Sequence, residues 1–114
     1  MKFVFIILLL SSFTSSAHAV ENQAELAALV LLKSEIQSKK IYPWTKMKCL
    51  NFVSGRVKDE EYFYFSIYEI HRNGCAGDPA TSPLVDTYRI NRASQNIEVR
   101  NRVDGNELDE WLPI

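Results

Sequence analysis

The chain has 114 residues and an almost balanced charge, with 13 Lys and Arg against 14 Asp and Glu and a formal net charge of −1 at pH 7. This length is typical of a single domain. The charge balance argues against nucleic acid or an anionic membrane as the main partner, because both require clustered Lys and Arg.

Residues 1–19 predict a cleaved secretion signal. A short basic start leads into an unbroken apolar run over residues 3–10, and small residues then lead to Ala17-His18-Ala19. This order is typical of a signal peptide with an A-x-A cleavage site. The apolar run is too short for a transmembrane helix, which needs about 20 residues.

Cleavage after this signal would leave residues 20–114 as one periplasmic or secreted domain. No later apolar stretch is long enough to anchor it, and Val20 is not a cysteine to which a lipid could be attached. Because Lys2 would be lost with the signal, 12 of the 13 basic residues remain against 14 acidic ones, a net charge of about −2. We expect no nucleic-acid partner and no membrane anchor after cleavage.

The two cysteines, Cys49 and Cys75, predict one disulfide, because a lone pair in an oxidising compartment is usually bonded. The bond would stabilise a domain of this size by roughly 3–4 kcal/mol in the chain-entropy account. A zinc site would need two more ligands, and His71 is the only histidine after the signal. We therefore expect neither a metal nor a cofactor.

Residues 22–40 predict a single helix. Asn22 is a good N-cap and Glu25 follows three residues later, as in a capping box, while Pro43 prevents continuation. We expect the apolar stripe of this helix to pack on the protein's own sheet, with a docking face for a partner as the alternative. The residues at helical spacing are Leu26, Leu29, Val30, Leu32 and Ile36.

The rest of the chain predicts strands joined by short connections. The candidates cover residues 47–57, 62–71, 84–91 and 96–100, and Asp104-Gly105 is a turn signal before the C-terminal tail. Short connections suit hairpins and exclude parallel crossovers. The predicted fold is α+β, with one N-terminal helix packed on an antiparallel β-meander of about four strands. This order of elements resembles the cystatin-like group and the small periplasmic PepSY-type modules.

The connection over residues 71–83 is long for a hairpin and rich in turn-forming residues. Two glycines, two prolines and the expected disulfide would hold it in one shape, and a rigid loop loses little entropy on binding. The alternative is a turn that only connects two strands. Residues 75–83 carry the pattern Cys-x-Gly-Asp-Pro-x-Thr-x-Pro and resemble short exported bacterial proteins of unassigned role, so the resemblance implies no function.

The strand over residues 62–71 has two different faces, because side chains alternate along a strand. Phe63, Phe65 and Ile67 should face the core. A row of tyrosines on the other face suits a protein interface, with ordinary aromatic pairs on a half-exposed sheet as the alternative. That row consists of Tyr62, Tyr64 and Tyr68.

Catalytic patterns are weak, and we do not expect an enzyme. Nucleophilic catalysis needs Ser or Cys beside a base, but the cysteines are expected to be bonded and no G-x-S-x-G is present. The adjacent acids of residues 59–61 suit a solvated turn. Glu69, Asp78 and Asp86 could meet near the loop and hold calcium, but their spacing is not that of an EF-hand.

These features favour an exported small protein-binding domain, with an inhibitor or immunity protein against a periplasm-acting hydrolase or toxin as the specific hypothesis. The alternative is a PepSY-like accessory or folding module of the cell envelope with no inhibitory role. The partner would be a protein. The predicted contact residues are Asp78, Pro79, Thr81, Tyr62, Tyr64 and Tyr68.

Overall fold

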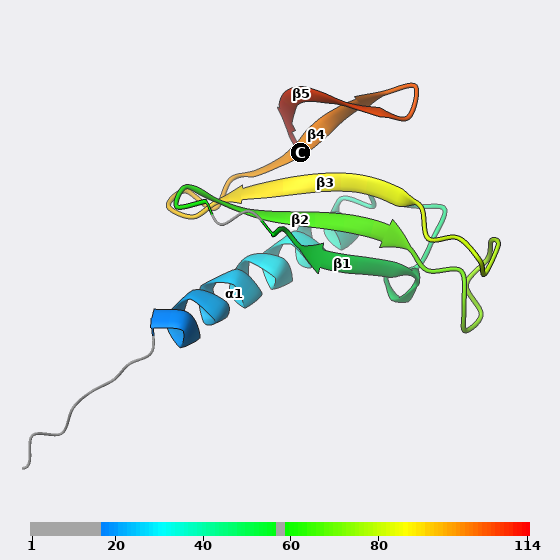
Figure 1. The fold of residues 1–114 in the computed structure, drawn as a ribbon, viewed down its shortest axis with the longest axis horizontal. Coiled ribbons are helices and arrows are strands. Elements are labelled where there is room, and N and C mark those ends of the chain that lie inside the picture. Colours follow the sequence, from blue (N-terminus) through cyan, green and yellow to red (C-terminus); the bar gives the residue numbers. More distant parts are fainter. Residues whose placement is uncertain (1–16, 57–58) are drawn as a thin grey trace, which may run out of the picture.

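A computed structural model of the protein describes residues 17–56 and 59–114 (Figure 1). Residues 1–16 of the predicted signal lie outside this part. Within it, no helix is both long and apolar enough to cross a membrane. The described chain forms one helix followed by five strands, which confirms the α+β class and corrects the expected number of strands from about four to five.

Helix α1 spans Ala17–Ser38, so the prediction that it begins at an Asn22 N-cap was wrong. Neither glycine nor proline occurs in this segment, and nothing interrupts propagation of the helix through Asn22. The helix ends in a Schellman motif, in which Ile41 N donates to Ile36 O at 3.1 Å and Lys40 N donates to Gln37 O. Lys40 has the left-handed φ of 50° that this motif requires.

The strands form one antiparallel sheet in the order β1-β2-β3-β4-β5 (Figure 1). A short 3-10 helix, Met47–Cys49, precedes β1. Strand β5 was missed because its acidic composition is unusual for a strand, but the Asp104-Gly105 turn before it was foreseen. Both turn residues have positive φ, as a two-residue hairpin turn requires. The strands are β1 Leu50–Ser54, β2 Tyr62–Glu69, β3 Leu84–Asn91, β4 Ile97–Val103 and β5 Asn106–Pro113.

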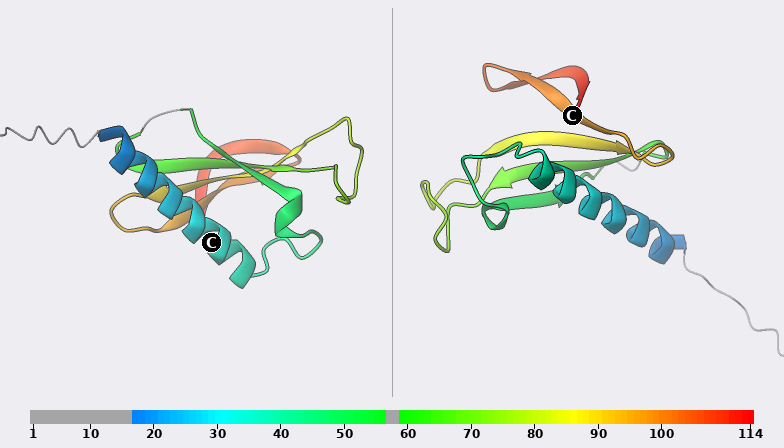
Figure 2. Two further views of the ribbon diagram at one scale, coloured as in Figure 1. Left: turned by 90° about the horizontal axis from the view of Figure 1, so that it is seen from below. Right: turned by 180° about the vertical axis from the view of Figure 1, so that it is seen from behind.

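The core lies between α1 and one face of the sheet (Figures 1 and 2). Phe63, Phe65 and Ile67 are buried there, as predicted. On α1 the buried stripe is Ala28, Leu32 and Ile36. The expectation that Leu26 and Val30 belong to it was wrong.

Leu26 and Val30 are each 60% exposed. Their positions on α1 are rotated by more than 90° from Leu32, since each residue turns the helix by about 100°. Small Ala28 lies on the buried side in their place. The helix therefore keeps an apolar strip that the sheet does not cover.

The sheet is strongly coiled. The ring centroids of Tyr64 on β2 and Trp111 on β5 lie 6.0 Å apart, although β3 and β4 separate these strands. In a flat sheet, three strand spacings would place the two backbones about 14 Å apart. Coiling therefore brings side chains from both halves of the sheet together on the face opposite α1.

Candidate functional site

The loop between β2 and β3, residues 70–83, extends beyond the end of the sheet (Figure 1). Cys75 in this loop is bonded to Cys49 at the end of the 3-10 helix, with the Cα atoms 5.6 Å apart. This confirms the predicted disulfide. The bond links the loop to the residue immediately before β1, so the loop is anchored to the sheet at a point outside its own two ends.

His71 is the second anchor of the loop. Its Nδ1 lies 2.8 Å from the carbonyl oxygen of Asp78, and its Nε2 lies 3.0 Å from Glu69 Oε2. The side chain is only 11% exposed. Gly77 lies against the imidazole with φ +117°, and a Cβ atom there would be 2.6 Å from the ring, so this position requires glycine.

The two hydrogen-bond acceptors around His71 favour the protonated ring. Both ring nitrogens face acceptors, and a neutral imidazole carries only one N–H, so both bonds form together only in the imidazolium. The bond to the Asp78 carbonyl raises the pKa of His71 most, the Glu69 carboxylate adds to this, and burial opposes it. When the ring is protonated, its ion pair with Glu69 joins the end of β2 to the middle of the loop.

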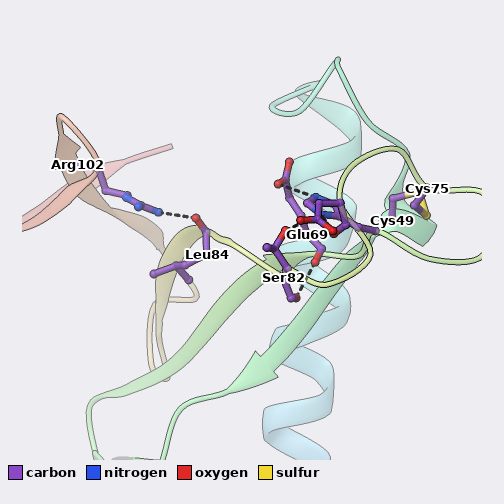
Figure 3. Close-up of polar contacts among 9 residues, drawn as sticks. Cys49, Glu69, Cys75, Ser82, Leu84 and Arg102 are labelled. Atoms are coloured by element: carbon purple, nitrogen blue, oxygen red, sulfur yellow. Dashed lines mark hydrogen bonds and ion pairs between the residues drawn. A yellow bond between two sulfur atoms is a disulfide. The ribbon is translucent and has the colours of Figure 1, made fainter.

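The far side of the loop also binds back to β2. Ser82 Oγ donates to Glu69 O at 2.7 Å (Figure 3). Glu69 N donates to Pro83 O at 2.9 Å. Between these anchors, Asp78 Oδ1 accepts from Ala80 N at 2.9 Å and closes a tight turn. The predicted contact residues Asp78, Pro79 and Thr81 are all exposed on this turn.

The structure separates the predicted contact residues into two groups. Tyr62 and Tyr64 lie at the beginning of β2, whereas the loop follows its end. The eight residues of β2 at about 3.3 Å each span roughly 26 Å. Of the three tyrosines, only Tyr68 lies at the loop end of the strand, next to a register shift in the pairing of β2 with β3.

Tyr62 and Tyr64 belong instead to a second candidate surface, which we call the aromatic–arginine cluster: Tyr62, Tyr64, Arg89, Glu98 and Trp111. The Arg89 guanidinium lies 4.2 Å from the Tyr62 ring centroid and 4.6 Å from that of Trp111. Its Nε donates to Glu98 Oε1 at 2.9 Å. The cation is thus held between two aromatic rings and a carboxylate, which fixes the rings in place.

Tyr64 is held from its other side. Its hydroxyl donates to Asp59 Oδ2 at 2.7 Å. Partial burial raises the pKa of Tyr64 most, and the bond to Asp59 raises it further. The pKa of Asp59 is lowered, mainly by the bond from Glu61 N and then by Tyr64. Sequence analysis missed Arg89 and Trp111 as members of this surface, because no sequence signal reports how far the sheet coils.

Asp86 takes part in a separate series of hydrogen bonds that includes Tyr42 and Tyr88. Tyr42 Oη donates to Asp86 Oδ2 at 2.6 Å and accepts from Tyr88 Oη at 2.6 Å, since its own hydrogen points to the carboxylate. Burial raises the pKa of Asp86 and raises that of Tyr88 to about 12. These hydrogen bonds connect Tyr42, in the segment after α1, to Asp86 and Tyr88 on β3. Glu69, Asp78 and Asp86 therefore do not meet, and no group of acidic, His and Cys side chains in the described residues suits a metal ion.

Comparison of the chain with models of known protein families, with curated proteins and with solved structures found no significant match. We therefore infer function from the geometry of the two candidate surfaces.

Proposed function

We propose that the protein is an exported protein-binding domain that presents loop residues 72–82 to a partner outside the cytoplasm. The supporting observation is an exposed loop held by the Cys49–Cys75 disulfide, by His71 and by Ser82. A loop already held in one shape loses little conformational entropy on binding. Pre-organised loops of this kind suit insertion into a cleft with little movement of the backbone.

Within this class we propose an inhibitor or immunity protein that blocks a hydrolase or toxin in the periplasm. Asp78 supports this, because it is exposed on the turn of the loop and its carboxylate would meet a basic group in the partner. Pro79 follows it and removes one backbone degree of freedom from the turn. A basic group is common in clefts that bind anionic cell-wall material, by the complementarity of opposite charges.

The alternative, an accessory module of the cell envelope, would use the face opposite α1. The aromatic–arginine cluster supports it, because fixed Tyr and Trp rings with a central Arg are typical of the energetic centres of protein interfaces. The two candidate functions therefore place the contact at opposite ends of β2, which makes them separable by mutation.

The test starts with capture of the partner from periplasmic extract by the exported protein, followed by affinity measurements with the purified partner. We expect Asp78→Ala to weaken binding by about thirtyfold, equivalent to about 2 kcal/mol for an energetic centre, and Asp78→Asn, which can keep the bond from Ala80 N, to weaken binding as well through the loss of charge. Tyr64→Ala is the matched control at the other end of β2 and should bind like the wild type. Loss in Tyr64→Ala with wild-type binding by Asp78→Ala would favour the accessory module instead. Wild-type affinity in both variants would contradict both contact surfaces.

A further inference from the structure

The two edges of the sheet differ in how they are protected. Strand β5 carries Glu107, Asp109 and Glu110 and ends in Pro113, and both charge and proline prevent a further strand from pairing. Strand β1 has the sequence Leu-Asn-Phe-Val-Ser, with neither a charged residue nor a proline. The edge of β1 therefore lacks the usual protection of a free edge.

The hydrogen bonds around β1 show which of its backbone groups are free. Gly55 N donates to Tyr64 O at 2.7 Å, and Ile70 N donates to Cys49 O at 2.8 Å. Because bonded and non-bonded pairs alternate in an antiparallel ladder, the backbone groups of Phe52 and Ser54 point away from β2. Within the described part of the chain, no hydrogen bond to these groups is formed.

The same reasoning applied to β5 explains its proline. Ile114 N donates to Ile97 O, so the nitrogens of Pro113 and Trp111 point outward from the sheet. Pro113 has no N–H to offer at that position. The outward amide of Trp111 provides an internal reference for any experiment on the edge of β1.

An apolar wall stands beside the free edge. Lys33 Nζ of α1 lies 5.0 Å from the ring centroid of Phe52 on β1, so this side of the helix faces β1. Exposed Leu26 lies seven residues before Lys33 and therefore on nearly the same side of α1, whereas Val30 is rotated by about 160° from buried Leu32 and points away from the sheet. Leu26 and the ring of Phe52 are therefore the apolar groups on this side that a bound chain could contact.

The rim of this edge is basic. The exposed cations around β1 are Lys33, Lys46, Lys48 and Arg56, and in the described residues none of them forms an ion pair. The nearby carboxylate of Asp59 is directed to Tyr64. An acidic chain would be attracted to this rim, because opposite charges steer and orient association.

A second copy of the protein is a poor occupant for the same reason. Antiparallel pairing of β1 with itself, centred on Phe52, would place Lys48 of one chain opposite Arg56 of the other. Like charges placed opposite each other across a strand pair are destabilising. The charge pattern thus favours another protein over self-association.

We propose that the edge of β1 accepts an extended acidic segment of another protein as an additional strand, with its apolar side chains against Leu26 and Phe52. This surface is separate from loop residues 72–82, so its test is independent of the proposed function. Main-chain bonds to Phe52 and Ser54 would supply affinity, and the basic rim would select acidic sequences.

The probe is a synthetic nine-residue peptide that alternates Val and Glu, compared with one that alternates Val and Lys. Amide hydrogen exchange of the exported protein is followed by NMR. We expect the acidic peptide to slow exchange at Phe52 and Ser54 and to leave Trp111 unchanged, while the basic peptide does neither. Unchanged exchange at Phe52 and Ser54 with millimolar acidic peptide, or equal effects of both peptides, would overturn the proposal.

Two variants sharpen the test. Ser54→Pro removes one outward N–H and leaves the hydrogen bonds that β1 forms with β2. It should therefore weaken binding of the acidic peptide by about five- to tenfold. Lys48→Gln with Arg56→Gln should also weaken binding of the acidic peptide. Ala93→Glu with Asn106→Glu makes the same change of net charge at two remote positions, one in the turn after β3 and one at the start of β5, and should not. If both double variants weaken binding of the acidic peptide equally, the basic rim does not select acidic sequences and the proposal is wrong. Protection of Phe52 that grows with protein concentration without peptide would identify a second copy as the occupant and also overturn it.

Discussion

The two ends of β2 are held in place by different physical means. At its C-terminal end, the loop over residues 70–83 has few apolar contacts and depends on a covalent bond, an ion pair of His71 with Glu69 and local backbone bonds. At its N-terminal end, the aromatic–arginine cluster depends on rings and a guanidinium that reach across four strands. The loop end can be exposed and still be held in one shape, because its constraints are the disulfide to Cys49 and bonds between residues of the loop and the end of β2. The cluster, in contrast, exists only when the whole sheet has coiled.

Breaking the Cys49–Cys75 disulfide should have the largest effect on the free energy of unfolding. It should loosen only the loop at the C-terminal end of β2. We expect Cys75→Ala to lower the free energy of unfolding by about 3 kcal/mol and to speed amide exchange in the loop. The ring contact of Tyr64 with Trp111 should persist in the folded variant, because the cluster contains no residue of the loop. Denaturant unfolding and amide exchange measure the two parts. A loss below 1 kcal/mol, or equal loosening of the cluster, would show that the ends are not independent.

Replacing Arg89 should disrupt the aromatic–arginine cluster at the N-terminal end of β2. Its effect on the free energy of unfolding should be smaller than that of Cys75→Ala. Arg89→Leu eliminates contacts with two rings and leaves Glu98 without its partner, so the free energy of unfolding should fall by about 1 kcal/mol. Trp111 emission should shift in a Trp44→Phe background, since Trp44 is the other tryptophan and is exposed. The loop amides should exchange as in the wild type. Arg102→Leu is the control, because Arg102 binds the carbonyl oxygens of Leu84 and Val85 and lies outside the cluster.

Titration of His71 should produce the smallest effect. Its folded-state pKa is raised above the ordinary value of 6.5, so its contribution to stability is complete below pH 6.5. That contribution is lost as the pH rises through the raised folded value. NMR titration of the imidazole and loop amide exchange as a function of pH measure it. A folded pKa below 6.5, or loop exchange unchanged by pH in the wild type when corrected with His71→Gln, would contradict the role assigned to this ion pair.

Local features of this fold could be read from the sequence because they depend on neighbouring residues. The predicted strand over residues 84–91 coincides with β3, and the tyrosine-rich strand matches β2 apart from its last two residues. The Asp104-Gly105 turn was recognised because it needs positive φ at both positions. The strand after that turn was not recognised, because it carries three acidic residues and offers no alternating apolar pattern.

The sequence by itself determined the α+β class, the Cys49–Cys75 bond and the buried face of β2, since each follows from composition or from a period of two. Only the tertiary structure decided which side of α1 is buried, because apolar residues cover much of its circumference and the sheet selected the side with small Ala28. It also decided that Arg89 lies between Tyr62 and Trp111, which depends on the coil of five strands. The environment of His71 depends on a loop that folds back to bring the carbonyl of Asp78, seven residues later in the chain, to its ring. Such contacts join distant or differently oriented backbone segments, and no periodicity in the chain encodes them.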